Sequence, residues 1–214
     1  MRIICIFYII FWTLPSTPAS KGDTPVDAIS GKNYFTATGV RDINITHQQL
    51  HVLIDPREHY ISGYVITTFK AGDSPISTIQ LDLDNVLTID SIQGSRGENL
   101  EYDRADNKVD INLTETLAAG RSTSISIYYQ GKPREDSGGS FVRSSHGSDD
   151  IIWTLSEPYG ARDWWPCGQN LTDKIDSLDL WITVPKGYRA ASNGLLVSET
   201  PTDNDRIVFH WSHR

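Results

Sequence analysis

The chain has 214 residues, which corresponds to one domain or at most two small ones. Its 19 basic and 27 acidic residues give a formal net charge of −8, so no nucleic acid is expected as a partner. Hydrophobic residues make up 38% of the chain, which is enough for a packed core. Two cysteines are too few for a disulfide scaffold or a Cys-rich zinc module.

The pattern of residues 1–20 is that of a secretory signal peptide. Arg2 precedes an apolar run over residues 3–14, and small residues and prolines follow up to Ser20. The run is shorter than the roughly 20 residues that span a bilayer, so a cleaved signal is favoured over its alternative, an uncleaved anchor. We therefore expect an exported protein, periplasmic or extracellular, without a stable transmembrane span. Cleavage would leave Cys167 as the only cysteine.

The remainder of the chain predicts β structure. Residues 21–39 are polar and rich in Gly, Ser, Thr and Pro, which is typical of a flexible leader. From residue 40 onwards, short segments alternate with period two between turn residues, and no window keeps a helical period. The prediction is an all-β antiparallel β-sandwich over residues 40–214. The members of the alternating segments are Leu50, Val52 and Ile54; Val65, Thr67 and Phe69; Ile79, Leu81 and Leu83; Val109, Ile111 and Leu113; Ile125, Ile127 and Tyr129; Leu178, Leu180, Ile182 and Val184; and Ile207, Phe209 and Trp211.

Two stretches depart from this regular pattern. Residues 134–150 contain Gly138-Gly139 and His146-Gly147 and predict a long mobile loop. The sequence stops at Arg214, directly after an alternating segment and without a polar tail, so we expect the natural polypeptide to continue.

Motifs for independent catalysis are weak. His47 and His51 have the spacing of a zinc-binding HExxH helix, but Gln48 stands where the catalytic glutamate belongs. Because the segment alternates like a strand, the two rings would lie about 13 Å apart, too far for one zinc at about 2 Å from each. Surface histidines are the favoured interpretation, and no metal site is expected. Cys167 is expected to be a small buried side chain rather than a nucleophile.

Aromatic and charged residues are densest in residues 151–168. This stretch holds three of the six tryptophans beside a Glu and an Arg, which is compatible with a ligand-binding wall. The alternative is a corner of the sandwich in which Trp164 and Trp165 fill the core and Arg162 pairs with an acid. Composition alone favours the corner.

Residues 156–167, Ser-Glu-Pro-Tyr-Gly-Ala-Arg-Asp-Trp-Trp-Pro-Cys, resemble the signature of the aminopeptidase N family of zinc metallopeptidases. In that family a Gln or Glu stands four residues before an Ala-Arg or similar pair, and an aromatic-Pro-Cys sequence follows. The resemblance covers about residues 40–214. Further matches, in order, are residues 51–56 with 61–65, residues 81–83, Lys174 and residues 191–194.

The resemblance implies that this chain is the N-terminal β-domain of such an enzyme, a saddle-like sandwich that packs on a thermolysin-like catalytic domain. The catalytic domain supplies a G-x-M-E-N loop, an HExxH helix and a distant third zinc ligand, and none of these motifs occurs in this sequence. Zinc is thus expected as the cofactor of that missing domain. This chain is expected to contain no catalytic residue and no metal ligand, and to be inactive by itself.

The resemblance carries one substrate contact over to this chain. Glu157 stands where the family places the Gln or Glu that reaches the active site and binds the free α-amine of a peptide. A carboxylate suits that role, since it accepts a charge-assisted hydrogen bond from an ammonium group. Tyr159, two residues further along the same loop, is the candidate for lining the pocket of the first side chain. Trp164, Trp165 and Arg162 are assigned to structure.

The family pattern is broken after Cys167. Many members have x-Asp-x-Pro there, whereas residues 168–171 are Gly-Gln-Asn-Leu, which leaves the subfamily and its side-chain preference open. The predicted function is the amine-recognising domain of an exported zinc aminopeptidase that removes single residues from peptides with a free N-terminus. Its partners would be those peptides and its own catalytic domain. The alternative is a secreted β-sandwich binding module that has lost the catalytic half and binds a partner through residues 153–165.

Overall fold

The computed structural model describes residues 5–8, 43–135, 140–170 and 174–214. Within these ranges the regular structure is β strand apart from a single 3₁₀ turn, η1 (Ala161–Asp163). The prediction of an all-β, sandwich-like domain built from antiparallel sheets is confirmed. The predicted leader at 21–39 lies outside the described residues, as does the predicted signal peptide except for β1 (Cys5–Tyr8).

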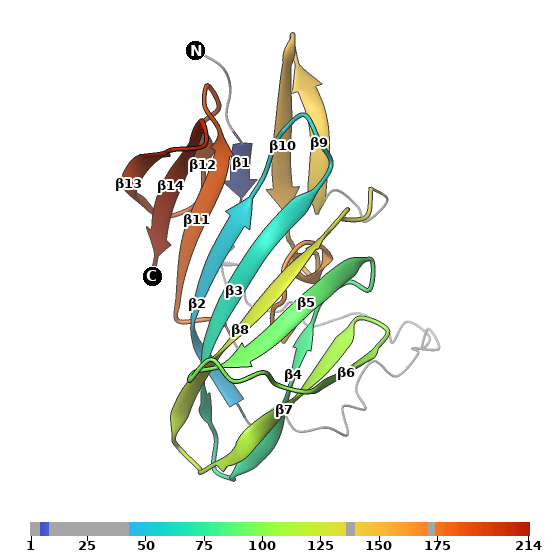
Figure 1. Cartoon of the computed structure of the whole chain (residues 1–214), viewed down its shortest axis with the longest axis vertical. Coiled ribbons are helices and arrows are strands. Elements are labelled where there is room, and N and C mark those ends of the chain that lie inside the picture. Colours follow the sequence, from blue (N-terminus) through green and yellow to red (C-terminus); the bar gives the residue numbers. More distant parts are fainter. Residues whose placement is uncertain (1–4, 9–42, 136–139, 171–173) are drawn as a thin grey trace, which may run out of the picture.

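The largest sheet has seven strands in the order β13-β14-β11-β2-β3-β8-β5. Its neighbours are antiparallel except β11 and β2, which run parallel. Figure 1 shows this sheet as a long twisted layer that runs the height of the molecule. Its strands are β2 (Ile43–Leu53), β3 (Ile61–Ala71), β5 (Leu87–Gly94), β8 (Ser122–Gly131), β11 (Ser177–Pro185), β13 (Leu195–Thr202) and β14 (Arg206–His213).

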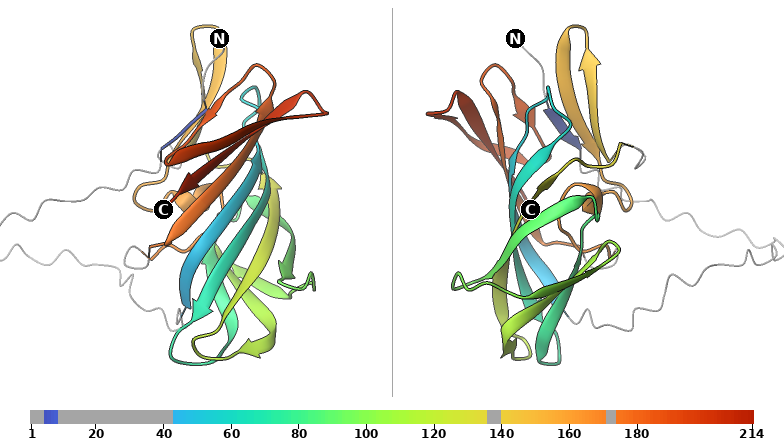
Figure 2. Two further views of the ribbon diagram at one scale, coloured as in Figure 1. Left: turned by 90° about the vertical axis from the view of Figure 1, so that its left-hand side faces the viewer. Right: turned by 45° about the vertical axis from the view of Figure 1, so that its right-hand side comes forward.

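Two smaller sheets lie on one side of the large sheet (Figure 2). A three-stranded antiparallel sheet has the order β4-β7-β6, and a four-stranded sheet has the order β12-β1-β10-β9, in which β1 runs parallel to both of its neighbours. The strands of the first are β4 (Ile76–Asp82), β6 (Tyr102–Ala105) and β7 (Lys108–Leu117). Those of the second, besides β1, are β9 (Phe141–His146), β10 (Asp149–Leu155) and β12 (Ala190–Ala191).

The core forms where the alternating side chains of these sheets meet. Val65 and Phe69 of β3 are fully buried, and they belong to one apolar cluster with Ile79 of β4 and Ile111 of β7. Thr67, two positions from each of them, is also buried, whereas Ile66 and Thr68, which alternate with these three, are only half-buried, as the period-two pattern predicts. The burial of these inward side chains supplies the main driving force for folding.

The prediction of a long loop over residues 134–150 is wrong for its second half. Residues 141–155 form the β9–β10 hairpin, which turns at Gly147 with a φ of +63°. Phe141 is buried and Val142 half-buried, whereas the remaining residues of β9 are polar and mostly exposed, so the apolar pattern was too weak a signal. Within the described residues, no helix is long and apolar enough to cross a membrane.

Candidate functional site

The loop segment, residues 156–169, follows β10 and precedes β11 in the chain. It contains Glu157 and Tyr159, and the structure places both on one turn directly after β10. Both side chains are exposed, Tyr159 at 51%. Figure 1 shows the coil of η1 between the lower end of the β9–β10 hairpin and the three-stranded sheet. The two predicted substrate-contact residues therefore share one exposed turn.

Hydrogen bonds to Ser156 close the start of this turn. The Gly160 N–H donates to the Ser156 carbonyl at 2.9 Å, and the indole Nε1–H of Trp164 donates to the Ser156 Oγ at 3.0 Å. Trp164 is fully buried, and Trp165 is buried beside it, with ring centroids 5.8 Å apart. The predicted placement of both tryptophans in the core is confirmed, and the first of them also anchors the residue before Glu157.

The far side of the turn is held through Gln169. Its side-chain Nε2 donates to the Tyr159 carbonyl at 3.1 Å, and its main-chain N–H donates to Oδ2 of Asp82 at 3.2 Å. Asp82 is fully buried at the end of β4 and pairs with the Lys108 ammonium. Asp82 and Cys167 exchange two backbone hydrogen bonds, of 2.8 and 3.0 Å. The loop segment is thus joined to the three-stranded sheet.

A glycine lets the turn pack closely on the start of the β9–β10 hairpin. A Cβ at Gly160 would lie 2.2 Å from the Oγ of Ser140, so only glycine fits without displacement. That hydroxyl donates to Oδ2 of Asp163 at 2.7 Å, within the buried interior. Burial raises the pKa of Asp163, while the hydrogen bond from Ser140 acts in the opposite direction. The turn therefore rests on a buried polar contact.

A second polar contact fixes η1 against the end of β4. The Asp84 N–H donates to the Arg162 carbonyl at 2.8 Å, and the carboxylate of Asp84 accepts a 2.7 Å hydrogen bond from Arg134 Nε. The predicted pairing of Arg162 with an acid is present but long, with 3.9 Å between its Nε and Oδ1 of Asp163. Arg162 thus contributes to the structure chiefly through its backbone.

Potential metal ligands are not gathered in the part of the chain that the structure describes. No group of three or more His, Cys, Asp or Glu residues in these ranges could hold a metal ion. Cys167 is buried with 2% of its surface exposed, in keeping with the predicted structural role. His47 and His51 lie on strand β2, as predicted, and His51 stacks between Tyr64 and Trp181 at 4.4 and 4.2 Å.

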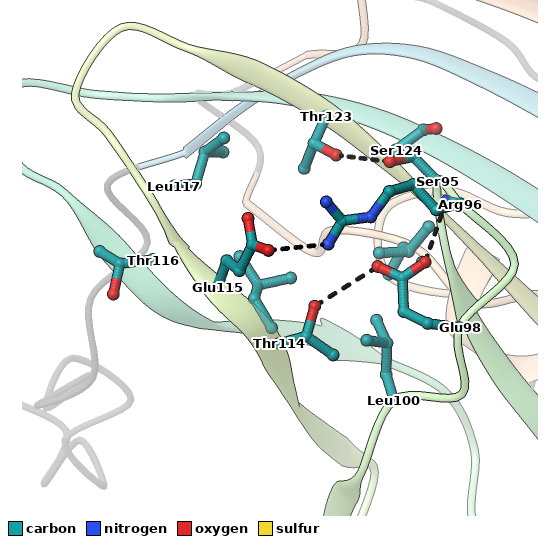
Figure 3. A pocket seen from close by; sticks show the side chains of 13 residues that line it. Ser95, Arg96, Glu98, Leu100, Thr114, Glu115, Thr116, Leu117, Thr123 and Ser124 are labelled. Atoms are coloured by element: carbon teal, nitrogen blue, oxygen red, sulfur yellow. Dashed lines mark hydrogen bonds and ion pairs between the residues drawn. The ribbon is translucent and has the colours of Figure 1, made fainter.

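A hollow of about 150 Å³ lies apart from this turn, between residues 94–98 and strands β7 and β8 (Figure 3). Its charged side chains bond to other residues of its lining: Arg96 pairs with Glu115 at 3.1 Å, and Glu98 accepts from Thr114 Oγ1 at 3.4 Å. Glu157 and Tyr159 do not line it. The hollow is therefore not part of the predicted substrate contact.

The all-β fold, with the motif of residues 156–167 beginning on an exposed turn after β10, resembles the β-domain of zinc metallopeptidases. The family model of the peptidase M1 N-terminal domain matches residues 44–214, so the chain belongs to this family. The resemblance drawn from residues 156–167 is thereby confirmed. A comparison with curated proteins finds no match.

Solved structures of M1 zinc metallopeptidases resemble the chain in fold and sequence. One from Deinococcus radiodurans has a TM-score of 0.73 at 26% identity, over 82% of this chain and 40% of that one. A point variant of a two-domain M1 zinc metallopeptidase bound to L-arginine has a TM-score of 0.72 at 27% identity, over 82% of this chain and 40% of that one. A Deinococcus radiodurans variant bound to a Tyr-Ser-Ala substrate has a TM-score of 0.68 at 26% identity, over 81% of this chain and 40% of that one. The chain spans about 40% of the length of these structures.

Sequence reasoning missed how the turn is fixed. Gln169 and Ser140 make the contacts that anchor it, yet neither belongs to a motif that was singled out for chemistry. The break in the family pattern at residues 168–171 marked the place of Gln169 without revealing its contact with Tyr159. Ser140 lies in a stretch that was predicted to be a loop, so no signal in the sequence pointed to it.

Proposed function

We propose that this chain is the substrate-amine-recognising domain of an exported zinc aminopeptidase that removes single residues from peptide N-termini. The observation that carries the proposal is the placement of Glu157: an exposed carboxylate on a turn whose backbone is held by Trp164 and Gln169. A charged acceptor on a fixed support is what recognition of a substrate ammonium group requires.

Glu157 would select for a free N-terminus and set the register of the peptide. When the site is closed, a carboxylate attracts an ammonium group more strongly because little water screens the pair. An acetylated N-terminus carries no charge and would lose this interaction. Tyr159 would border the pocket for the first side chain, since its ring is half-exposed on the same turn. A similar structure bound to a Tyr-Ser-Ala substrate supports peptides as the substrate class.

Zinc binding and bond cleavage are assigned to a catalytic domain outside this chain. The described residues do not fit zinc, because they offer no group of three suitable ligands. We therefore expect residues 1–214 alone to be inactive towards peptides. The role of this chain is to bind the substrate amine and to pack on the catalytic domain.

The proposal is tested in the complete gene product with Glu157→Ala and with Glu157→Gln as the matched control. For a free-amine substrate, Glu157→Ala should raise KM and lower kcat/KM by roughly 10- to 100-fold, which corresponds to one lost charge-assisted hydrogen bond. Glu157→Gln, which keeps an acceptor oxygen, should lose less. Because Glu157 is exposed, the unfolding midpoint should be the same in all three proteins.

Parental kinetics in Glu157→Ala would refute the assignment of Glu157. A complete gene product that binds peptides but never cleaves them would instead favour the alternative, a binding module that uses residues 153–165.

Export is proposed on the pattern of residues 1–20 and is tested by N-terminal sequencing of the protein from its native host. A mature protein that starts near residue 20 would support it, whereas an intact Met1 in the cytoplasm would refute it. Cleavage would remove β1, whose backbone pairs with β10 and β12 in the whole chain, so the processed protein would present both strand edges open.

A further inference from the structure

We propose that Gln169 is a positioning residue that fixes the Tyr159 side of the turn through its side-chain amide, and so controls how the first residue of the substrate is received. The part that concerns the substrate rests on the function proposed above. The mechanical part, that Gln169 holds the turn, stands on the geometry of this chain alone.

Gln169 can link the turn to β4, a role called the strut below, because both its main-chain N–H and its side-chain amide form hydrogen bonds. Its main-chain N–H donates to the buried carboxylate of Asp82, which also pairs with Lys108. Two residues earlier in the chain, Cys167 is joined to Asp82 by two backbone hydrogen bonds. The base of the strut is therefore fixed to β4, and a side chain that starts from a fixed base loses less entropy when it forms a further contact.

From that base the side chain reaches the turn. Nε2 of Gln169 lies 3.1 Å from the Tyr159 carbonyl and 3.5 Å from Sγ of Cys167. A carbonyl only accepts, so the contact requires a donor at position 169. A glutamate would have the same shape but would present two acceptor oxygens to the carbonyl and repel it. The chemistry of the contact is thus specific to the amide.

The hydrogen bond from Gln169 reaches the part of the turn that carries both proposed substrate-contact side chains. Tyr159 projects an exposed ring, and its backbone follows Glu157 by two residues, so a shift of the Tyr159 carbonyl moves both side chains. On the other side, Ser156 is held by Trp164. Without Gln169 the turn would keep its anchors at Ser156 and Gly160, but the Tyr159 carbonyl between them would lose its side-chain donor and could shift. The expected consequence is poor discrimination of the first substrate side chain with little change in the bond-breaking step.

The experiment compares Gln169→Glu and Gln169→Met with the parent, all as the complete gene product. Both variants keep the main-chain bond to Asp82 and the length of the side chain, but neither donates to Tyr159. Amide hydrogen exchange in a peptide that covers residues 156–160 should be about fivefold faster in both variants, since one hydrogen bond is lost. The midpoint of global unfolding should stay that of the parent. Unchanged exchange in both variants would overturn the strut.

The substrate part is read from KM and kcat for free-amine substrates with a small and with a large first side chain. Both variants should raise KM by roughly three- to tenfold for the large side chain and less for the small one, with kcat nearly constant. Equal changes for both substrates, or a change in kcat alone, would overturn control of the first residue.

Glu157→Ala in the same assay separates the two hypotheses. If the KM of Glu157→Ala equals that of the parent while amide hydrogen exchange at residues 156–160 is faster in the Gln169 variants, the proposed function is refuted. The proposal that Gln169 holds the turn then still stands.

Discussion

The loop segment at residues 156–169 and the outer face of the seven-stranded sheet are held together in opposite ways. In the loop segment, the backbone is held mainly by separate contacts with particular partners, such as the bond between Trp164 and Ser156. On the sheet, backbone pairing continues from strand to strand, and the side chains follow from its register. Losing one side chain therefore has different consequences in the two regions.

The sheet carries an aromatic ladder, a row of rings on neighbouring strands β8, β3, β2, β11 and β14. Each ring stacks on or tilts against the next, with centroids 5.2, 4.4, 4.2 and 4.1 Å apart. Register alone brings the rings together, because each is the direct cross-strand partner of its neighbour. In that order the ladder consists of Tyr128, Tyr64, His51, Trp181 and His210. On this face, each inner ring is therefore held by contacts with two neighbouring rings as well as by the pairing of its strand.

Two tryptophans, one from each region, give the strongest test of this contrast. Trp164→Ala should lower the free energy of unfolding by about 3–5 kcal/mol, because it leaves a cavity in the core and removes the donor to Ser156. Trp181→Ala, from the half-buried ladder, should cost only about 1–2 kcal/mol, since the backbone pairing around it persists. Denaturant unfolding of both variants measures the difference. Equal losses of unfolding free energy in the two variants, or a smaller loss in Trp164→Ala than in Trp181→Ala, would contradict the proposed difference between the two regions.

The fold was predictable where the information is local. Alternation within β3 placed Val65 and Phe69 in the core without knowledge of any partner strand, and the structure agrees. Strand β9 of the β9–β10 hairpin was missed because the residues after Phe141 and the half-buried Val142 are polar and mostly exposed, so its pattern lacks a second buried apolar position. Local periodicity therefore succeeds only when several residues of a strand face the core.

The candidate site was predictable only in part, for a related reason. The motif at residues 156–167 drew attention to Glu157 and Tyr159, and both lie on one exposed turn. The contacts that hold this turn join residues far apart in the chain: Ser140 and Asp163 are 23 positions apart, and Asp82 and Gln169 are 87. No periodicity connects such pairs, so only the three-dimensional structure reveals them.

The aromatic ladder should make the protein sensitive to mild acid through His51. Burial between its neighbouring rings and, to a lesser extent, the charge of His210 lower the pKa of His51 from 6.5 to about 4. Between these two values the unfolded chain binds a proton that the folded chain does not, so stability is lost as the pH falls from about 6.5 to about 4. Because His51 is only half-buried, solvent screening reduces the effect to about 1 kcal/mol.

Asp179, which contacts His210 on this face, acts in a lower pH range. Burial alone would raise the pKa of Asp179, but hydrogen bonds from Ser212 and His210 and the nearby His47 lower it overall. Its contribution to stability is present above 3.8, the ordinary value, and is lost only below it. Loss of stability between pH 6.5 and 4 therefore reports on His51 rather than on Asp179.

His51→Phe separates stacking from protonation. The substitution keeps an aromatic ring between Tyr64 and Trp181, so the ladder should persist and the stability at pH 7 should change little. The dependence of the unfolding free energy on pH between 6.5 and 4 should become shallower than in the parent. A slope equal to that of the parent would show that the acid sensitivity arises elsewhere. A large loss already at pH 7 would show that the imidazole itself, not the stacking shared among five strands, holds this face together.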